Sequence, residues 1–282
     1  MQSAKTSYIC FNGDMQPADT PVFKVTNRGY RYGDGFFETM KFWKGKVLLY
    51  SFHLERIKQS LNLLNYRLAI PVEDIFDKVH ELCQLNQCND AARIRLSFFN
   101  GEGGVFDADG LLGYAVEATP VPVVFPTLNT NGLVMGFCKS AFKSSDAYAS
   151  LKSANYLLYR MAADTARPRG WDDAFVLNHH GRVIESAIAN IFWVKDGQLF
   201  TPPLSEGCVQ GTMRAYILQQ MAKNDFVVIE KPCMPDDILT ADEIFLTNAS
   251  FGISWVARVE YKTYTHQIIA GLYEKLIVPL YW

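Results

Sequence analysis

Three prolines fall within the ten residues ATPVPVVFPT, and this run divides the chain into two parts. A proline fixes its φ angle and has no backbone N–H, so such a run cannot form regular structure internally. We therefore expect an interdomain linker at residues 118–127. It separates an N-terminal α+β lobe at residues 1–117 from a C-terminal lobe at residues 128–282. A chain of 282 residues is long enough for two modest domains.

The N-terminal lobe shows hairpin and helix patterns in turn. Residues 8–18 predict a hairpin that turns at Asn12-Gly13-Asp14, and residues 36–50 predict two strands joined at Lys44-Gly45. Leucine and isoleucine then recur at helical spacing, which predicts a helix with Ser51 as its N-cap. A second helix is expected after Pro71, and ARIRLSFFNG alternates as a strand does.

The C-terminal lobe mixes strands and helices in the same way. GLVMGFCK predicts a strand, and the run SANYLLYRMAADTA at residues 153–166 predicts a helix. Residues 172–203 read as a meander, residues 211–225 as a helix that opens after Gly211, and residues 243–259 as closing strands. The fold class expected for the whole chain is therefore α+β, with two lobes.

Composition limits the partners and the compartment. The 27 basic and 29 acidic residues nearly cancel, so neither nucleic acid nor a membrane surface is an expected partner. The N-terminus lacks the apolar run of a signal peptide. The six cysteines are scattered and form no C-x-x-C pair, which argues against a zinc site and against a disulfide framework. We expect a cytoplasmic protein without a bound metal.

Two residues stand out against their neighbours. Lys152 lies in LKSANY, next to leucine and small residues rather than among charges. A lysine in less polar surroundings has a lowered pKa, and its free amine can attack a carbonyl; the alternative is an exposed residue at a helix start. Glu185 lies in the apolar strand VIESAIANIFW, where an acid is costly to bury without a partner such as a protonated ring nitrogen. Its alternative is a strand edge that faces water.

Two further elements suit a phosphate group. In HLER, Arg56 follows His53 by three residues on one helix face, and an inward guanidinium there would bind phosphate with two parallel hydrogen bonds. A surface position is the alternative. In QGTMRAYIL, the backbone amides of Thr212 and Met213 open a helix and could hold an anion. An amine, a buried acid, an arginine and a helix-start cradle together describe a pyridoxal phosphate site.

Several blocks of the sequence resemble one family. LKSANYLLYRMAA, DDAFVLNHHGRVIESAIANIFW and TPPLSEGCVQGTMR look like signature blocks of the class IV, or fold-type IV, aminotransferases. YRYGDGFFETMKFWKGKV and HLERIKQSLNLL match the N-terminal block of that family, and the resemblance runs from about residue 8 to residue 256. The family includes branched-chain aminotransferase, D-amino-acid aminotransferase and aminodeoxychorismate lyase. The resemblance implies the two-lobed, D-amino-acid aminotransferase-like fold and pyridoxal 5'-phosphate as cofactor.

The resemblance also implies roles for individual residues. Lys152 would form the Schiff base with the cofactor and move the proton at the substrate carbon, and Glu185 would pair with the pyridine nitrogen. The phosphate would be held by Arg56 and by the later residues Thr212, Met213, Asn248 and Ala249. Tyr156 would reach the phenolic oxygen of the cofactor, although a packing role fits it equally well. Asn190 would support the site through backbone hydrogen bonds.

The substrate is the least determined property. Where D-amino-acid aminotransferases and the best-known lyases carry a carboxylate-binding arginine, the loop NGEGGVFDADG has Val105. Arg95 falls where branched-chain enzymes carry an arginine, and Tyr32, Phe37 and Glu38 resemble the wall of their substrate pocket. We therefore favour a transaminase that acts on small or branched L-amino acids and a 2-oxo acid. GDGFFET and Asn248-Ala249 instead resemble aminodeoxychorismate lyase, which releases pyruvate and 4-aminobenzoate and is the close alternative.

Two further expectations concern catalysis and assembly. A non-catalytic binding protein on the same fold is the remote alternative, because such a protein would have no reason to keep Lys152, Glu185 and Arg56 together. Fold-type IV enzymes are generally homodimers. The aromatic content of 13% and the apolar tail LYEKLIVPLYW fit a subunit interface, although a terminal helix packed on its own lobe fits equally well.

Overall fold

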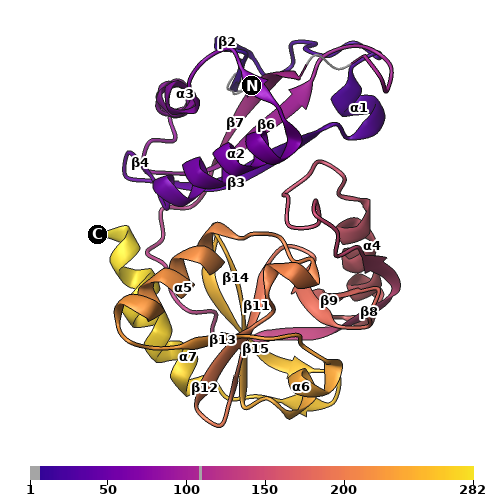
Figure 1. The fold of residues 1–282 in the computed structure, drawn as a ribbon. Helices are drawn as coiled ribbons and strands as arrows, with labels where there is room; N and C mark the ends of the chain where they lie inside the picture. The colour runs from indigo at the N-terminus through magenta and orange to yellow at the C-terminus, as the bar shows by residue number, and fades with distance from the viewer. Residues whose placement is uncertain (1–6, 108–109) are drawn as a thin grey trace. The chain divides into compact units, whose positions relative to one another are not determined.

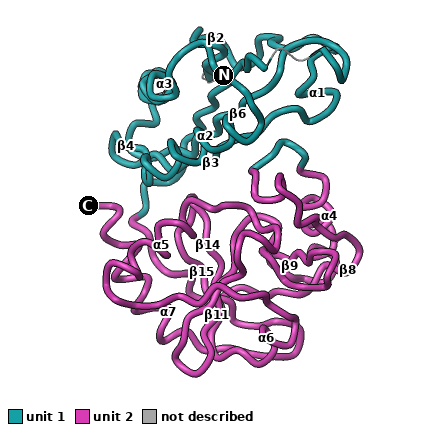
Figure 2. Tube along the Cα trace, in the orientation of Figure 1, with its two compact units in different colours: residues 1–124, 152–155 teal, residues 125–151, 156–282 magenta. Residues whose placement is uncertain are grey.

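The computed structural model describes residues 7–107 and 110–282. By their contacts these residues form two compact units, which are coloured separately in Figure 2. Unit 1 holds the described residues up to Val124 together with residues 152–155. Unit 2 holds Phe125–Leu151 and Tyr156–Trp282. The segment that carries Lys152 therefore belongs to unit 1 by its contacts, although the sequence assigned it to the C-terminal lobe.

The proline-rich segment begins later than expected. Strand β7 (Leu111–Pro120) pairs with β6 (Ala91–Asn100) as far as the pair Ala92 and Pro120. Pro120 is the last residue of the strand, where its missing N–H interrupts no further ladder bond. The expectation of irregular structure throughout residues 118–127 is thus wrong for the first three residues.

Unit 1 is a sheet that carries helices (Figure 1). Its strands follow the order β2-β1-β7-β6-β3-β4, and β5 pairs with β7. Besides β6 and β7 they are β1 (Tyr8–Phe11), β2 (Asp14–Pro17), β3 (Gly35–Trp43), β4 (Lys46–Val47) and β5 (Arg67–Leu68). Its helices are α1 (Arg28–Tyr32), α2 (Tyr50–Leu64) and α3 (Val72–Leu85). The hairpin at residues 8–17 and the strands either side of Lys44-Gly45 are confirmed.

The helix starts in unit 1 test the capping argument. Helix α3 begins directly after Pro71, as expected. Helix α2 begins at Tyr50, and Leu49 occupies the N-cap position without a side-chain hydrogen bond. Ser51 is therefore inside the helix, and its expected capping role is wrong. The packing of Ile57 into the core, where it is fully buried, holds this helix in place without a capping side chain.

Unit 2 is built around a second, larger sheet. Strand β10 pairs with both β9 and β11, so the path β10-β9-β8-β15-β14-β11 closes on itself and leaves no free edge along that ring. The strands are β8 (Leu133–Lys143), β9 (Asp173–Asn178), β10 (Val183–Ser186), β11 (Asn190–Lys195), β12 (Gln198–Thr201), β13 (Val228–Glu230), β14 (Glu243–Asn248), β15 (Gly252–Val259) and β16 (Lys262–Thr263). The helices are α4 (Leu157–Ala166), α5 (Thr212–Lys223), α6 (Pro235–Thr240) and α7 (Gln267–Leu272). The expected meander and the helix after Gly211 are confirmed.

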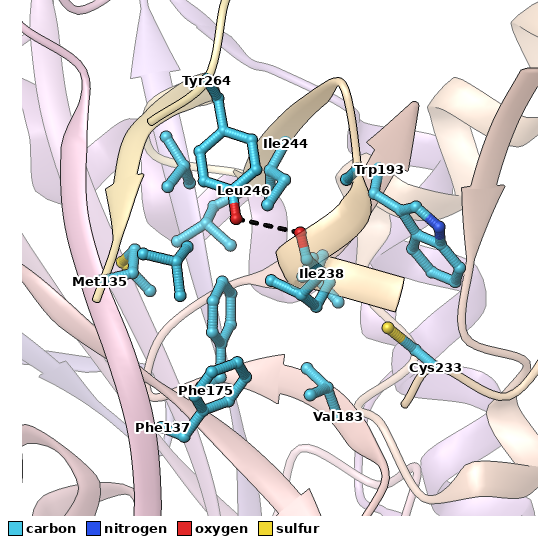
Figure 3. Close-up of a cluster of buried hydrophobic side chains, with 14 of the residues drawn as sticks. Met135, Phe137, Phe175, Val183, Trp193, Cys233, Ile238, Ile244, Leu246 and Tyr264 are labelled. Atoms are coloured by element: carbon cyan, nitrogen blue, oxygen red, sulfur yellow. Dashed lines mark hydrogen bonds between the residues drawn. The ribbon is translucent and has the colours of Figure 1, made fainter. Parts of the chain in front are cut away.

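One apolar cluster lies on the α6 side of this sheet (Figure 3). Phe175, Trp193 and Leu246 come from different strands and are almost fully buried. The Tyr264 hydroxyl donates to the Ile238 carbonyl oxygen of α6 at 2.9 Å, so its polar atom is satisfied inside the cluster (Figure 3). Burial of such side chains contributes roughly 1.5–3 kcal/mol each.

A second cluster fixes α4 against β8 and β9. Ala162 and Ala166 are buried and small, which lets the helix approach Ala174 and Val176 of the sheet closely. Tyr159 belongs to the same buried face of the helix. The packing of α4 places the Tyr159 hydroxyl 2.7 Å from the carboxylate of Glu185 on the adjoining strand β10.

The helices are short. The longest of those described, α2, has 15 residues. Within residues 7–107 and 110–282, no helix combines the length and the apolar character that a membrane span requires.

Candidate active site

Lys152 lies in an extended segment that pairs with strand β3. The Phe37 N–H donates to the Lys152 carbonyl oxygen at 3.0 Å, and Ser153 forms an isolated bridge with Phe36. The Ala154 N–H donates to the Gly35 carbonyl oxygen at 3.0 Å. The lysine backbone is thus held on a strand of unit 1, and α4 begins only at Leu157. Both the helix predicted from residue 153 and the alternative of a helix-start lysine are wrong at this position.

A glycine makes this docking possible. Gly33 ends α1 with a φ of +64°, a conformation that side chains rarely adopt. A Cβ atom at this position would overlap the Asn155 side-chain oxygen. The glycine-rich stretch YGDG therefore gives the segment after Lys152 room to lie against unit 1.

Phe37 brings the lysine and a second cation to one ring. The Lys152 Nζ atom lies 4.6 Å from the Phe37 ring centroid, and the Arg95 guanidinium lies 4.0 Å from it. Both distances are within cation–π range. Of the three expected substrate residues, Phe37 thus contacts the lysine, and Arg95 contacts the same ring. The third, Tyr32, is 42% exposed, and its ring lies 5.8 Å from the Arg28 guanidinium.

Arg56 is buried in a cluster that the sequence did not predict. Its Nε donates to Glu38 Oε1 at 2.7 Å and its Nη2 to Glu38 Oε2 at 2.5 Å, and His53 Nδ1 lies 2.6 Å from Oε2. Arg56 is therefore not a surface residue. Glu38 is 1% exposed and is the counterion of Arg56. Its expected place in the wall of the substrate pocket stays a prediction. Its type and position in the FFET strand were visible in the sequence, but its partner was not.

The charges in this cluster fix its protonation. Burial alone raises the pKa of Glu38, but the nearby Arg56 and His53 outweigh it and lower the pKa to about 2. Burial lowers the pKa of His53 below its ordinary value, although the Glu38 carboxylate opposes this shift. At neutral pH Glu38 is ionised and His53 is neutral.

Glu185 is buried in unit 2, where a strand irregularity directs it. The register of β10 against β9 shifts between Val183 and Glu185, as in a β-bulge, which redirects side chains. Glu185 is 3% exposed, so the alternative of a water-facing strand edge is wrong. Its Oε1 accepts hydrogen bonds from Lys143 Nζ and from the Tyr159 hydroxyl, each at 2.7 Å. Its Oε2 accepts the Val209 N–H at 2.8 Å.

Lys143 and Tyr159 are site residues that the sequence reasoning missed. Lys143 Nζ also donates to the Tyr159 hydroxyl oxygen at 2.5 Å. Burial, followed by the Glu185 charge, raises the pKa of Tyr159 well above its ordinary value, so the hydroxyl stays protonated. The helical spacing put Tyr159 on the apolar face with Ala162, but nothing in the sequence pointed from Lys143, at the end of β8, to Glu185.

The other residues expected in unit 2 surround the turns near Glu185. The Tyr156 hydroxyl donates to the Ala187 carbonyl oxygen at 2.9 Å, and the ring lies 4.6 Å from the Tyr159 ring. Asn248 Oδ1 accepts the backbone N–H groups of Ser250 and Phe251 at 2.9 and 3.1 Å, and its Nδ2 donates to the Ile188 carbonyl oxygen at 3.2 Å. Asn248 therefore shapes the turn that contains Ala249.

The start of α5 is a second polar feature of unit 2. Thr212 and Met213 form its first turn, where backbone N–H groups have no acceptor within the helix. Asn190 Nδ2 donates to the Val209 carbonyl oxygen at 2.8 Å, which holds the segment before this helix as expected. A Cβ atom at Gly211 would overlap Asn190 Oδ1, so a larger residue there would displace the Asn190 side chain from its present position. The neighbouring Thr247 Oγ1 is buried without a hydrogen-bond partner among the described residues.

Comparison with known proteins identifies the family. The family model for class IV amino-transferases matches residues 35–259, which is most of the chain. The chain belongs to the class IV aminotransferases, and the family predicted from its sequence blocks is confirmed. Its fold is that of the fold-type IV pyridoxal phosphate enzymes, and it is an enzyme of the aminotransferase and lyase group.

Named relatives and a solved structure carry both activities considered above. A Methanocaldococcus jannaschii protein provisionally named as a branched-chain-amino-acid aminotransferase is 28% identical over 276 residues, covering 95% of this chain and 93% of that protein. The aminodeoxychorismate lyase of Vibrio harveyi is 28% identical over 236 residues, covering 83% and 86%. The crystal structure of the branched-chain aminotransferase from Thermoproteus uzoniensis with norvaline superposes with a TM-score of 0.85 at 23% identity, covering 98% and 96%.

Proposed function

We propose that this enzyme uses pyridoxal 5'-phosphate to transfer an amino group between a small or branched L-amino acid and a 2-oxo acid. The observation that carries the proposal is the environment of Glu185. A buried carboxylate with one oxygen saturated and the other holding a single hydrogen bond is suited to accept one more donor. A protonated pyridine nitrogen is such a donor.

Other groups in the chain fit the same cofactor. The first turn of α5 offers backbone N–H groups to a phosphate, and the helix dipole favours the negative charge. The Thr247 hydroxyl, which has no hydrogen-bond partner within residues 7–107 and 110–282, is a further donor in unit 2, on the strand that ends at Asn248. Lys152 supplies an amine, and Arg56 supplies a guanidinium that Glu38 holds in a fixed orientation.

The residues have distinct roles in this proposal. Bound pyridoxal phosphate supplies an electron sink for the substrate carbon. Lys152 binds the cofactor covalently and moves the proton at the substrate α-carbon. Glu185 keeps the proton on the ring nitrogen, and the Tyr156 hydroxyl exchanges its hydrogen bond to the Ala187 carbonyl oxygen for one to the phenolic oxygen. The Arg56 guanidinium would bind the phosphate. Amide groups would bind it too, from Thr212, Met213, Asn248 and Ala249.

The substrate class is inferred from unit 1. The Phe37 ring contacts both Lys152 and Arg95, so it offers an apolar surface beside a guanidinium that can bind a carboxylate. The loop position discussed above holds Val105, an exposed side chain without charge. The Methanocaldococcus jannaschii relative supports a branched-chain substrate.

Aminodeoxychorismate lyase is the second candidate function. The Vibrio harveyi relative is as similar in identity, and the GDGFFET loop resembles the lyase pattern. Both reactions begin with removal of the α-proton by the lysine, so the residues named above serve either one. The products of the reaction distinguish the two functions.

The experiment uses the purified enzyme loaded with pyridoxal phosphate. L- and D-amino acids are added singly with 2-oxoglutarate, and aminodeoxychorismate is added separately. Keto acid release from L-leucine or L-valine, with glutamate formed, is the expected result. Pyruvate and 4-aminobenzoate from aminodeoxychorismate, without amino transfer to 2-oxoglutarate, would establish the lyase instead. Lys152→Ala is the matched control and should be inactive in both assays.

We also propose that the enzyme is a homodimer, as its family resemblance implies. Sedimentation of the loaded enzyme at micromolar concentration should give a mass of twice 31.9 kDa. A single species at the mass of one chain would contradict this assembly. The cytoplasmic location expected from the sequence stays a prediction.

A further inference from the structure

The contacts of Glu185 divide its two oxygens into different roles. Oε1 accepts Lys143 Nζ and the Tyr159 hydroxyl, which fills the two acceptor positions of a carboxylate oxygen. Oε2 accepts one donor among the described residues, the Val209 N–H. Only Oε2 retains room for a further short hydrogen bond.

We infer that Lys143 is a positioning residue that, together with Tyr159, fixes Glu185 as an anion and presents its Oε2 atom to the cofactor nitrogen. The inference rests on the proposed function, because it concerns the same acid and the same cofactor. Lys143 and Tyr159 are not among the residues to which the family resemblance assigned a role.

Burial gives this arrangement its strength. The side chains of Lys143 and Glu185 are 10% and 3% exposed, so water screens their interaction little. An ionised carboxylate in such a place requires a cation or several donors. Without cofactor, Lys143 is the cation that pairs with Glu185. In the loaded enzyme the protonated ring nitrogen would be a second cation beside the same carboxylate.

Two cations that share one carboxylate oppose each other. The ammonium of Lys143 weakens the hold of Glu185 on the ring proton and makes the site more positive. Lys143 therefore tunes the cofactor as well as orienting its acid. The other groups facing Glu185 do not change charge near neutral pH: Tyr159 of α4 has a raised pKa, and burial raises the pKa of the Cys208 thiol, before α5, to about 12.

The test is the visible absorption band of the enzyme loaded with pyridoxal phosphate, followed as a function of pH. In Lys143→Met, one positive charge is lost near the cofactor, so the pH midpoint of the band should rise by about 0.5–1 unit. Lys143→Arg keeps the charge and should retain the wild-type midpoint. Tyr159→Phe removes one donor from Oε1 and should shift the midpoint in the same direction by less.

Stability separates positioning from packing. Without cofactor, Lys143→Met leaves Glu185 unpaired and should reduce the folding equilibrium constant by about 10²–10³-fold. The double variant Lys143→Met/Glu185→Gln removes the stranded charge and should recover most of that loss. If Lys143→Met does not fold, the pH midpoints of the absorption band in Lys143→Arg and Tyr159→Phe test the inference. A midpoint that does not change in Tyr159→Phe would overturn it. A midpoint that changes in Lys143→Arg would overturn it as well.

The outcomes also separate this inference from the proposed function. A wild-type protein that shows no visible band with pyridoxal phosphate would overturn both. A normal band whose midpoint is the same in wild type and Lys143→Met would overturn only the role of Lys143. Lost stability without a shifted midpoint would reduce Lys143 to a structural counterion and would also overturn the inference.

Discussion

The candidate site includes a buried glutamate beside a cation in each unit, Glu38 in unit 1 and Glu185 in unit 2, and the two glutamates are used differently. Both oxygens of Glu38 in unit 1 accept hydrogen bonds from Arg56, and Oε2 also contacts His53 Nδ1. These partners occupy the whole carboxylate. Glu185 in unit 2 is held by a lysine and a tyrosine on one oxygen only. Burial is nearly the same for both acids, at 1% and 3% exposed.

The difference shows that the pattern of donors, more than burial, distinguishes a structural acid from one suited to bind a ligand. A bidentate arginine leaves a carboxylate little room for another partner, and here it also orients the guanidinium. A lysine makes a single contact and leaves the second oxygen accessible. If this interpretation is correct, changes to Glu38 should affect mainly folding and changes to Glu185 mainly catalysis.

The largest expected effect is on stability in unit 1. Glu38→Ala leaves the buried Arg56 charge without its counterion and should lower the free energy of unfolding by about 3–5 kcal/mol. Urea unfolding followed by circular dichroism measures this change. The control is Glu117→Ala, whose half-exposed carboxylate lies 3.9 Å from Arg95 and should change stability by less than about 1 kcal/mol. Equal losses in the two variants would contradict a special role for Glu38.

The next effect is on catalysis in unit 2. Glu185→Gln keeps the shape of the side chain but cannot hold the ring proton by charge, so kcat should fall by about 10²–10³-fold. Its stability should fall less than that of Glu38→Ala, because the amide can still hydrogen-bond. Steady-state kinetics with the amino acid that the proposed assay identifies measures kcat. A variant with full kcat would remove Glu185 from the cofactor site.

A smaller effect follows from pH. The pKa of Glu38 is lowered to about 2 in the folded protein from an ordinary value of 4.5. Its contribution to stability is therefore complete above pH 4.5 and is lost as the pH falls toward 2. The pKa of His53 is also lowered in the folded protein, from an ordinary value of 6.5. Below pH 6.5 the unfolded chain therefore takes up a proton on His53 before the folded protein does, and stability decreases further. Unfolding free energies between about pH 7 and pH 3 should decline in wild type, and Glu38→Ala should flatten the part below pH 4.5. Parallel curves for the two proteins would show that other groups cause the decline.

The smallest effect concerns Arg95, whose side chain is 45% exposed. Arg95→Gln removes the cation next to Phe37 and should raise KM for the amino acid by about fivefold, since an exposed charge contact contributes about 1 kcal/mol. The unfolding free energy should stay within about 0.5 kcal/mol of wild type. An unchanged KM would mean that the carboxylate is bound elsewhere.

Local patterns predicted much of the fold. Alternation in ARIRLSFF, the turn residues Asn12-Gly13 and the proline before α3 act over a few residues, and the corresponding elements are present. The start of α2 was mispredicted because packing of Ile57 fixes that helix without the Ser51 cap. The first residues of 118–127 were mispredicted because pairing with β6 extends β7 to its final proline.

The sequence by itself determined the family, the two-part division and the identity of Lys152, Glu185 and Arg56 as residues with special chemistry. It did so because residue type and local spacing are read along the chain. Only the tertiary structure decided their partners: Glu38 for Arg56, Lys143 and Tyr159 for Glu185, and Phe37 for Lys152. These partners come from other strands and helices, between 18 and 42 residues away for the two ion pairs. Contacts of that kind depend on how the sheets pair and how the helices pack, and no local pattern encodes them.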